Sequence, residues 1–339
     1  MSTDVTVVVG GQAGSEGKGA VCDALHRQQR YTVAVRVGGP NAGHTVVDRE
    51  GRRFALRQLP VASVSDPYCD LMIAAGSEVD VEVLEQEIRM VEDAGYSVRR
   101  RLSVDREATL IDASAVELER NIGTGTTGKG IGGARAQRAL RQARRVADVE
   151  DQVEWRVSDT QHALRRESGD GSVLVEGTQG YVLGTHAGYY PYATSGNCRA
   201  ADFMAWCGFP PQPAEVWIVL RMHPIRIAGD SGPMHSETTW ANIGVPEEKT
   251  TVTKKVRRVG YWDPYWAIKS IEANTYWGAG MVNVALTFVD YDCPELSGQN
   301  GMAVMDDLPI ALRDRINQIK SYGGRVRYLG TGERTGLWL

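Results

Sequence analysis

The sequence predicts an α/β protein built on an open, doubly wound and mostly parallel sheet. Apolar runs of strand length alternate along the chain with segments in which apolar residues recur at helical spacing. The strand-like runs are continuous and rich in valine, which is typical of parallel strands that are buried on both faces. Alternation of such strands with helices favours a doubly wound sheet, whose ligands bind at the carboxyl ends of the strands.

Six apolar runs are expected to form buried strands, and they cover residues 5–9, 32–37, 71–75, 172–177, 214–222 and 282–289. A helix is expected over 20–30. Two further helices are indicated by single apolar stripes, which comprise Val81, Leu84, Ile88 and Val91, and Leu308, Leu312, Ile316 and Ile319. Because the chain contains no internal repeat and no low-complexity linker, we expect one domain over 1–339 with long insertions near 123–133 and 229–260.

Composition narrows the class of protein before any motif is considered. The 339 residues, 42% of them apolar, can bury a sizeable core, and a net charge of -4 gives no overall field that would attract nucleic acid or an anionic membrane. Five cysteines without a C-x-x-C pair predict reduced thiols and a cytoplasmic location, in the host cytoplasm if the protein is viral. No apolar run reaches the roughly 20 residues of a membrane span. We therefore expect a cytoplasmic protein that is neither exported nor anchored, and any anion site in it must be local.

The stretch "GGQAGSEGKG" (10–19) is a glycine-rich loop that follows the first expected strand and leads into a helix. Backbone N–H groups and the helix N-terminus can surround a phosphate there, with Lys18 as a point charge. The loop departs from the pattern G-x-x-x-x-G-K-[ST] at Gln12 and at Gly19, and a tight turn without a ligand is the alternative. The stretch "GKGIGG" (128–133) has the spacing G-x-G-x-x-G, but no valine-rich strand precedes it, so a dinucleotide site is not indicated.

A second glycine loop, "VGGPNAGHTVV" (37–47), follows the second expected strand and carries Asn41, Gly43, His44 and Thr45. The carboxyl ends of parallel strands share one edge of a sheet, so this loop is expected near the first one. A lone histidine is more often a packed or surface residue than a catalyst. The surrounding glycines, asparagine and threonine favour a functional role for His44.

Together these loops resemble the two glycine loops of adenylosuccinate synthetase, whose typical first loop reads G-x-Q-W-G-D-E-G-K-G. The resemblance continues in "NIGTGTTGKGIGG", "EGTQGYVLGTHAGYYPYATSGN", "TTVTKKVRRVGYWD" and "LGTGERTG", in the family's order. It implies a P-loop-NTPase-like fold in a homodimer, and a ligase that uses Mg²⁺. A nucleoside triphosphate phosphorylates the 6-oxygen of a purine monophosphate, and L-aspartate then displaces that phosphate.

The resemblance also implies the site residues. His44 resembles the general acid, Lys18 contacts the transferring phosphoryl group, and Gly43 resembles a magnesium ligand through its carbonyl. The purine monophosphate would be bound by Ser15, Asn41, Thr127, Arg141, Gln179, Thr194 and Lys255. Arg141 would reach in from the other subunit, although a solvated basic helix face is the alternative there. L-aspartate would be bound by Thr251, Thr253, Lys255 and Arg257. The triphosphate would contact Gly14, Glu16, Gly17, Lys18, Gly19, Gly43, His44, Thr45, Arg257, Asp290, Gly330, Thr331 and Gly332.

The sequence departs from the family at Ser15, where the family has an aspartate that accepts the purine N1 proton and ligates Mg²⁺. A serine hydroxyl is a poor general base near neutral pH, so Ser15 is a weak substitute in the catalytic and metal-binding roles. Either the enzyme is impaired or its substrate differs. Guanine carries an amino group on C2, beside N1, and the shorter serine leaves space there and offers an oxygen that can accept from that amine.

A bacteriophage branch of the family, the 2-aminoadenylosuccinate synthetases, resembles this sequence in having serine at this place, and joins aspartate to dGMP. Two further departures are compatible with that branch. Lys255 replaces an arginine that approaches the ribose and loses its bidentate fork, and Phe288 replaces the lysine of T-K-x-D while Asp290 is kept. The second change leads to the hypothesis that the phosphoryl donor is ATP or dATP instead of GTP.

Three functions remain open from the sequence. The favoured one is a ligase that makes 2-amino-2'-deoxy-N6-succinylAMP from dGMP and L-aspartate. The second is an ordinary adenylosuccinate synthetase that acts on IMP, and the third is a catalytically silent nucleotide-binding regulator. None of them requires a nucleic acid or a membrane as partner.

Overall fold

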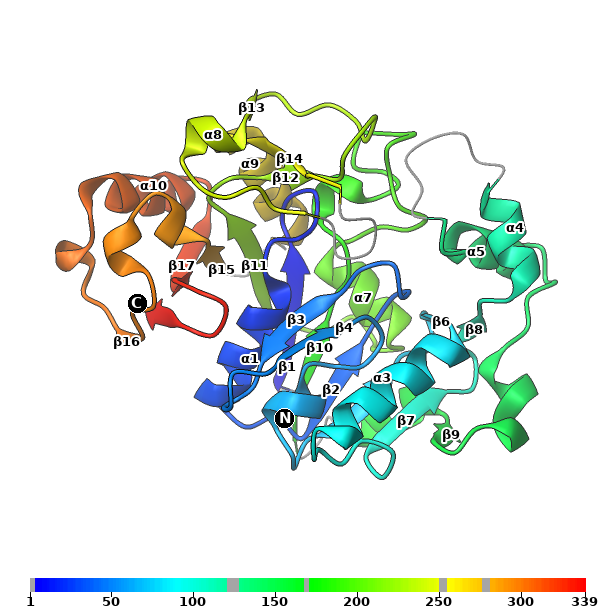
Figure 1. Ribbon diagram of the computed structural model, residues 1–339. Coiled ribbons are helices and arrows are strands. Elements are labelled where there is room, and N and C mark those ends of the chain that lie inside the picture. Colours follow the sequence, from blue (N-terminus) through cyan, green and yellow to red (C-terminus); the bar gives the residue numbers. More distant parts are fainter. Residues whose placement is uncertain (1–3, 121–127, 168–170, 250–254, 276–280) are drawn as a thin grey trace. The chain divides into compact units, whose positions relative to one another are not determined.

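The structure is a computed structural model that describes residues 4–120, 128–167, 171–249, 255–275 and 281–339 (Figure 1). The chain forms two compact units. Unit 1 consists of Met1–Val8, Lys18–Thr178 and Ala200–Glu215, and unit 2 of Val9–Gly17, Gln179–Arg199 and Val216–Leu339. The first strand, β1 (Asp4–Gly10), begins in unit 1 and ends in unit 2.

Unit 1 contains parallel strands in the order β1-β10-β2-β5-β7-β9. Besides β1, these strands are β10 (Ser172–Glu176), β2 (Val33–Arg36), β5 (Asp70–Ile73), β7 (Leu102–Asp105) and β9 (Arg156–Ser158). In the register, Val7 lies opposite Val175, which in turn lies opposite Val35, and all three side chains are buried. Burial on both faces explains why the central strands read as continuous apolar runs.

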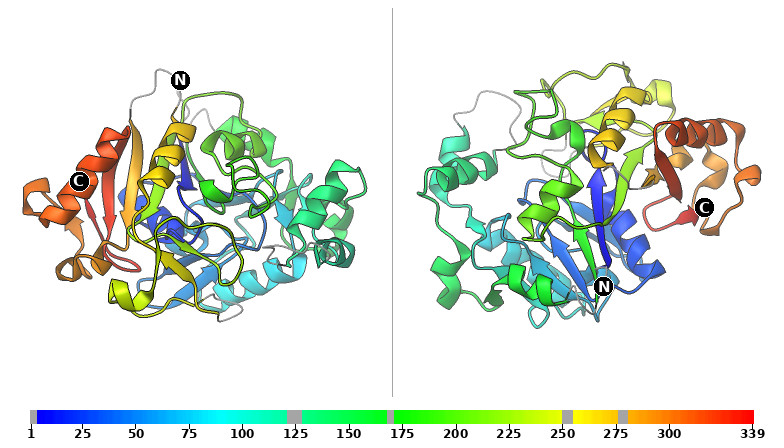
Figure 2. Two further views of the ribbon diagram at one scale, coloured as in Figure 1. Left: turned by 90° about the horizontal axis from the view of Figure 1, so that it is seen from above. Right: turned by 180° about the vertical axis from the view of Figure 1, so that it is seen from behind.

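Helices cover both faces of these strands, as Figures 1 and 2 show. The helices α1 (Lys18–Gln28) and α3 (Val81–Asp93) lie on one face, and α6 (Thr160–Glu167) and α7 (Ala200–Trp206) lie on the other. This arrangement confirms the doubly wound α/β architecture. The smaller elements of unit 1 are α2 (Ala62–Ser65), the hairpin β3 (His44–Val47) and β4 (Arg53–Leu56), the pair β6 (Glu78–Val79) and β8 (Thr109–Leu110), the helices α4 (Ala113–Arg120) and α5 (Ile131–Ala139), and the 3₁₀ helix Val146–Gln152.

The glycines of "GKGIGG" serve close packing of α5 against α4. A Cβ added at Gly133 would lie 2.0 Å from the carbonyl oxygen of Ala115, so only glycine fits there. Gly130 precedes α5 with a φ of 83°, a left-handed conformation that favours glycine. Two of the three glycines in this spacing, Gly130 and Gly133, are therefore explained by the start of α5 and by its packing against α4.

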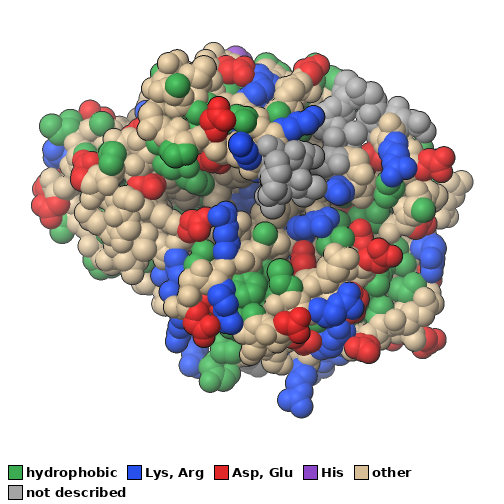
Figure 3. Space-filling model, in the orientation of Figure 1, with side chains coloured by type: hydrophobic (Ala, Val, Ile, Leu, Met, Phe, Trp, Pro, Cys, Tyr) green, Lys and Arg blue, Asp and Glu red, His purple; other side chains and the backbone are tan. Residues whose placement is uncertain are grey.

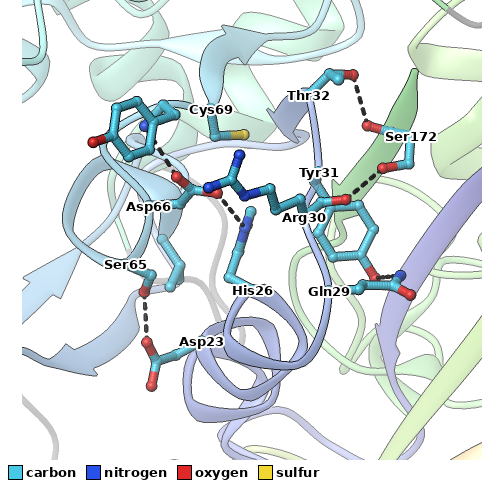
Figure 4. A network of polar contacts seen from close by, with 12 residues as sticks. Asp23, His26, Gln29, Arg30, Tyr31, Thr32, Ser65, Asp66, Cys69 and Ser172 are labelled. Carbon is cyan, nitrogen blue, oxygen red and sulfur yellow. Dashed lines mark hydrogen bonds and ion pairs between the residues drawn. The ribbon is translucent and has the colours of Figure 1, made fainter. Parts of the chain in front are cut away.

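Polar contacts hold the middle of α1 and the segment that follows it (Figure 4). The Ser65 hydroxyl donates to Asp23 at 2.7 Å, and the Ser172 hydroxyl donates to the carbonyl of Arg30 at 2.7 Å. The first contact ties α1 to α2, and the second ties the segment after α1 to β10.

Unit 2 continues the α/β pattern with strands in the order β16-β18-β17-β15-β11. The strands β11 (Glu215–Arg221), β15 (Val282–Thr287) and β17 (Gly324–Gly330) are parallel, β18 (Gly336–Trp338) runs antiparallel to β17, and β16 (Gly301–Met302) pairs with β18. The helices α9 (Pro264–Asn274) and α10 (Ile310–Ser321) lie on one face of these strands (Figure 2).

A small antiparallel sheet occupies the insertion near 229–260. Its order is β12-β14-β13, and its strands are β12 (Ile225–Arg226), β14 (Arg258–Gly260) and β13 (Glu237–Thr238), with α8 (Trp240–Ile243) following β13. Short 3₁₀ helices cover Tyr181–Leu183, Val289–Tyr291, Pro294–Leu296 and Met305–Asp307. The insertion is thus ordered where it is described.

All six predicted strands form, but some boundaries differ. The strand predicted over 282–289 ends at Thr287, because Phe288 adopts a left-handed backbone conformation with a φ of 57°. The helix predicted over 20–30 begins earlier, at Lys18. The strand β17 was not predicted, since its sequence "GRVRYLG" alternates charged and apolar residues.

The face drawn in Figure 3 carries Lys and Arg side chains interspersed with Asp and Glu. This mixture agrees with the small net charge of -4. Among the described residues, no helix is both long enough and apolar enough to cross a membrane.

Candidate active site

The first glycine loop is organised by Glu16, which is fully buried in unit 2. Its Oε1 atom accepts hydrogen bonds from the backbone N–H groups of Gln12 at 3.1 Å and Gly14 at 2.8 Å. The loop turns through left-handed conformations at Gly14, Ser15 and Gly17, with φ values of 90°, 57° and 86°. Such a conformation is uncommon for serine and places its side chain in an exposed position.

Two arginines of unit 2 contact Ser15. The Arg257 Nη1 atom donates to Ser15 Oγ at 2.9 Å, and the Arg221 Nη1 atom donates to the Ser15 carbonyl at 3.1 Å. Burial, together with the charge of Arg221, lowers the pKa of Arg257 from its ordinary value despite the opposing effect of Glu248. Ser15 is therefore a neutral acceptor whose hydroxyl is already engaged by a cation, and it is unsuited to act as a base.

The predicted site for the base of the triphosphate contains Phe288 and Asp290. The Phe288 ring stacks on the guanidinium of Arg221, with the guanidinium carbon 4.0 Å from the ring centroid. The Oδ1 atom of Asp290 is buried and has no hydrogen-bond partner among the described residues, and burial raises the pKa of this carboxyl. A buried acceptor without a partner is costly, so Asp290 suits a ligand that donates a hydrogen bond.

His44 is the first residue of β3 in unit 1 and is 3% exposed. Its Nδ1 atom lies 2.8 Å from Oε2 of Glu176, which ends β10 and is fully buried. The other carboxyl oxygen of Glu176 accepts from the backbone N–H of Val61 at 2.7 Å. Both oxygen atoms of the Glu176 carboxyl thus have a hydrogen-bond partner, and the His44 ring is held in one orientation.

Arg36, at the end of β2, lies against the His44 ring. Its Nη1 atom is 3.0 Å from Nδ1 and 2.8 Å from Nε2. Because the two distances are nearly equal, Nη1 is not aligned with the lone pair of either ring nitrogen. Burial and the nearby charges of Arg36 and Lys18 lower the pKa of His44 well below its ordinary value. Burial raises the pKa of Glu176 to about 7, although Arg36 opposes this shift. The imidazole is therefore neutral near pH 7.

The pairing of His44 with Glu176 determines which ring nitrogen carries the hydrogen. When Glu176 is ionised, Nδ1–H donates to it. When Glu176 is protonated, it donates to Nδ1, and the hydrogen of the neutral ring is on Nε2. The second state can offer an N–H to an oxygen on which negative charge develops.

Cys22, His44 and Glu176 bring one donor atom each within 4.8 Å of one another, a spacing that a metal ion could use. The guanidinium of Arg36 already lies against two of these groups, and burial raises the pKa of the Cys22 thiol well above its ordinary value. A neutral thiol beside an arginine is a poor cation ligand. We interpret this cluster as a proton-holding group, not as a metal centre.

The other predicted residues of unit 1 fall close to His44 in the chain or on neighbouring elements. Lys18 begins α1 and is 5% exposed. Gly19 is required because an added Cβ would lie 2.4 Å from the carbonyl oxygen of Thr45 on β3. Asn41 is half-buried, Gly43 is exposed, and Arg141 is exposed with a φ of 63° just after α5.

The remaining predicted site residues of unit 2 differ in backbone conformation and in burial. Gln179 has a φ of 60°, and the N–H of Thr194 donates to the Leu183 carbonyl at 2.7 Å. Thr331 is fully buried and its hydroxyl donates to the Gln299 carbonyl at 2.6 Å, so a triphosphate would meet its backbone. The other residues of this group are Gly330, which is buried, and Gly332 and Lys255, which are exposed. Thr127, Thr251 and Thr253 lie outside the described residues.

Sequence reasoning missed four charged residues that contact predicted site residues within their own unit, namely Arg36, Glu176, Arg221 and Glu248. A signal for three of them was present. Arg36, Glu176 and Arg221 each end an apolar strand, and each is 1% exposed or less. Charged residues are almost never fully buried unless they are paired, so such positions mark a polar site.

The doubly wound sheet, and a glycine loop that leads into a helix beginning at Lys18, are typical of proteins that bind nucleotides. Comparison with known proteins makes this specific. The family model of adenylosuccinate synthetase matches residues 7–156 and 148–291. The chain belongs to the adenylosuccinate synthetase family and is a ligase that forms a C–N bond.

Curated relatives and solved structures agree with this assignment. Adenylosuccinate synthetase of Thermococcus sibiricus is 35% identical over 96% of this chain and 95% of the relative. The N6-succino-2-amino-2'-deoxyadenylate synthase of Vibrio phage phiVC8 is 32% identical over 97% of this chain and 96% of the relative. The structure of cyanophage S-2L succinoaminodeoxyadenylate synthetase (PurZ), bound to dGMP and dATP as an energy donor, matches with a TM-score of 0.83 and 28% identity over 98% of this chain and 94% of that one. The fold is also that of adenylosuccinate synthetase from Plasmodium falciparum, with a TM-score of 0.80, 20% identity, and coverage of 99% and 100%.

Proposed function

We propose that the protein joins L-aspartate to C6 of dGMP through a 6-phosphoryl intermediate and produces 2-amino-2'-deoxy-N6-succinylAMP. The observation that carries this proposal is Ser15, which stands where the family has a catalytic aspartate. Its side chain is exposed, neutral and held by Arg257 at 2.9 Å. A hydroxyl oxygen has two lone pairs, so Ser15 can accept from Arg257 and from the C2 amine of guanine together.

The choice of guanine over hypoxanthine follows from this arrangement. IMP has no C2 amine and leaves the second lone pair of Ser15 without a donor. An aspartate at position 15 would fill the space that the amine needs. Selectivity for dGMP therefore comes from an attractive contact and from the absence of an obstructing carboxylate.

The chemical step uses residues from both glycine loops. Lys18 supplies a positive charge to the transferring phosphoryl group, and the backbone N–H groups of its loop supply further donors. His44, oriented by Glu176, donates from Nε2 to the 6-oxygen and stabilises the charge that develops there. Arg257 binds a carboxylate of L-aspartate. Thr251, Thr253 and Lys255 are proposed to complete that pocket.

The phosphoryl donor is proposed to be ATP or dATP. Asp290 offers a buried acceptor oxygen without a partner, which suits the exocyclic amine of adenine. Phe288 provides no N–H for the 6-oxygen of guanine and stacks on Arg221 instead. The proposed site for the base of the triphosphate therefore keeps the hydrogen-bond acceptor, Asp290. It lacks the lysine that would donate a hydrogen bond.

The residues fit a magnesium ion only in part. Mg²⁺ prefers charged oxygen ligands, whereas Ser15 Oγ is neutral and accepts from a guanidinium. The carbonyl of Gly43 is the protein ligand that remains, so we propose that Mg²⁺ is held mainly by phosphate oxygens. When bound, the ion would neutralise charge on the transferring phosphoryl group.

The phage relatives support the proposal through their substrates. The Vibrio phage relative is named for 2-amino-2'-deoxyadenylate, and the cyanophage structure holds dGMP and dATP. Identity alone does not separate them from archaeal adenylosuccinate synthetases, since the values are 32% and 35%. A synthetase acting on IMP is therefore the second candidate. A homodimer, with Arg141 serving the partner's site, is part of the proposal.

The direct test is a matrix of assays. Purified protein is incubated with L-aspartate, Mg²⁺ and either dGMP or IMP, each combined with ATP, dATP or GTP, and the products are identified by mass. We expect the succinylated dGMP product with ATP or dATP. A succinylated product from IMP alone would support the second candidate, and no product from any combination would support a silent regulator.

A further inference from the structure

Four residues of unit 2 form a closed ring of hydrogen bonds. Arg221 Nη1 donates to the Ser15 carbonyl at 3.1 Å and to Oε2 of Glu248 at 3.3 Å, and Arg221 Nη2 donates to Oε1 of Glu248. The backbone N–H of Arg257 donates to the Glu248 carbonyl at 2.9 Å. Arg257 Nη1 then closes the ring at Ser15 Oγ. We call this set the Glu248 ring.

The charges in the Glu248 ring require a carboxylate at position 248. The Arg221 side chain is fully buried, and the Phe288 ring covers its guanidinium. Burial alone would raise the pKa of Glu248, but the charge and hydrogen bonds of Arg221 lower it below the ordinary value. Glu248 therefore stays ionised and offsets one of the two guanidinium charges. The positive charge that remains resides on Arg257.

Arg257 is fixed at both ends. Lys249 and Val256 pair in an antiparallel bridge, which brings Glu248 beside Arg257 in space. The Glu248 carbonyl holds the Arg257 backbone, and Ser15 Oγ holds Nη1. Among the described residues, none accepts from Nε or Nη2 of Arg257. That edge of the guanidinium is the one that can bind a carboxylate with two parallel hydrogen bonds.

We propose that Glu248 is a positioning residue for the dicarboxylate substrate, because it holds Arg257 and Ser15 in the arrangement that leaves the Nε–Nη2 edge of Arg257 open. The proposal rests on the proposed function only in assigning Arg257 to the amino dicarboxylate. Glu248 touches no substrate. Its effect is transmitted through Arg221, through Ser15 and through its own carbonyl.

The test is Glu248→Gln, which keeps the shape of the side chain and removes its charge. We expect the KM for L-aspartate to rise by about tenfold or more, because the charge of the buried Arg221 is then no longer offset, repels Arg257 and shifts it. The KM values for both nucleotides are expected to change by less than about threefold, since a positioning role for one substrate acts on that substrate. The measurement is steady-state kinetics with each substrate varied in turn.

The matched control is Glu237→Gln. Glu237 binds the neighbouring Arg258 through two hydrogen bonds of 2.6 Å each, outside the Glu248 ring. This variant neutralises the carboxylate of another glutamate–arginine ion pair. It is expected to leave the KM for L-aspartate within about twofold. Equal rises in all three KM values for Glu248→Gln, or an equal rise in the aspartate KM for Glu237→Gln, would overturn the proposal.

A milder variant keeps the test informative if Glu248→Gln does not fold. Tyr291→Phe removes only the hydroxyl that donates to Oε1 of Glu248 at 3.0 Å. It is expected to raise the aspartate KM alone, by less than Glu248→Gln does; no change, or a rise shared by the nucleotides, would contradict the proposal. The assays use whichever purine nucleotide the unmodified enzyme prefers. A preference for IMP would refute the proposed function and leave this test intact.

Discussion

At the scale of single residues, Ser15 is the residue through which the proposed function links purine choice to aspartate binding. Its hydroxyl accepts from Arg257, its carbonyl accepts from Arg221, and its backbone is left-handed with a φ of 57°. These two hydrogen bonds and the left-handed backbone together define the direction of the Ser15 side chain. Small changes there are expected to alter substrate preference before they alter folding.

Ser15→Asp tests the role of this residue in selecting the purine. The carboxylate would supply a base and would crowd the C2 amine, so the ratio of kcat/KM for dGMP to that for IMP should move toward IMP by about tenfold or more. The new carboxylate would also pair with Arg257 and raise the KM for L-aspartate.

Ser15→Asn is the control, because asparagine is neutral, has nearly the shape of aspartate and tolerates left-handed φ values. It should crowd the C2 amine as aspartate does and lower kcat/KM for dGMP, but it supplies no base and should not raise kcat/KM for IMP. A ratio that is unchanged in Ser15→Asp, or that moves toward dGMP, would mean that Ser15 does not select the purine.

The sequence reveals some of these residues better than others. Ser15, Lys18 and His44 could be found because they interrupt glycine loops in a recognisable order. Glu248 could not, because it lies in a polar insertion and its partner Arg221 is distant in the chain. Only the fold brings them together, and no local pattern records that contact.

At the scale of elements, strands with continuous apolar runs were predicted correctly, whereas β17, which pairs with a strand on each side, and the edge strand β9 were not. Runs such as "VTVVV" encode burial on both faces. The strand β17 contains Arg325 and Arg327 among its apolar residues, and β9 has only three residues, so neither forms a continuous apolar run. Helix α1 also contains a buried histidine, His26, and its sequence does not predict that burial.

His26 is buried near the end of α1 and packs edge-on against Tyr31, with ring centroids 5.1 Å apart (Figure 4). Neither ring nitrogen has a hydrogen-bond partner among the described residues, and the Asp66 carboxyl is 3.9 Å away. Burial lowers the pKa of His26 from 6.5 to about 4, although Asp66 opposes the shift. The neutral ring is therefore the form that fits the folded protein.

The consequence is a loss of stability in acid. The unfolded chain takes up a proton on His26 below pH 6.5 and the folded protein does so only near pH 4, so stability falls as the pH drops between these values. The contribution of His26 to this fall is expected to reach about 3 kcal/mol. Urea denaturation at pH 7 and at pH 4.5 measures it.

His26→Gln should flatten this dependence, whereas His162→Gln, at an exposed position on α6, should retain it. Equal pH dependence in His26→Gln and in the unmodified protein would show that another group is responsible.

At the scale of the whole molecule, the chain divides into two units, and the predicted site residues are distributed over both. The prediction of a single domain over 1–339 stays a prediction. The homodimer is likewise a proposal, and it has a specific consequence through Arg141. This residue is exposed after α5, so its assignment to the partner's site can be tested by exchange of subunits.

Arg141→Ala and His44→Ala are each expected to be inactive alone. After unfolding and refolding together in equal amounts, random pairing gives hybrids in half of the dimers, and each hybrid holds one intact site. Activity should therefore recover to about a quarter of that of the unmodified enzyme. Recovery is measured against each variant refolded alone, and its absence would place Arg141 on the basic surface of α5 or within its own subunit's site.

The central claim is that the enzyme selects dGMP over IMP. An internal competition tests it most directly, because equal concentrations of dGMP and IMP in one reaction, with L-aspartate, Mg²⁺ and ATP, give products in the ratio of the two kcat/KM values. Mass spectrometry at low conversion reads that ratio. We expect 2-amino-2'-deoxy-N6-succinylAMP to exceed adenylosuccinate by about tenfold or more. An excess of adenylosuccinate would contradict it.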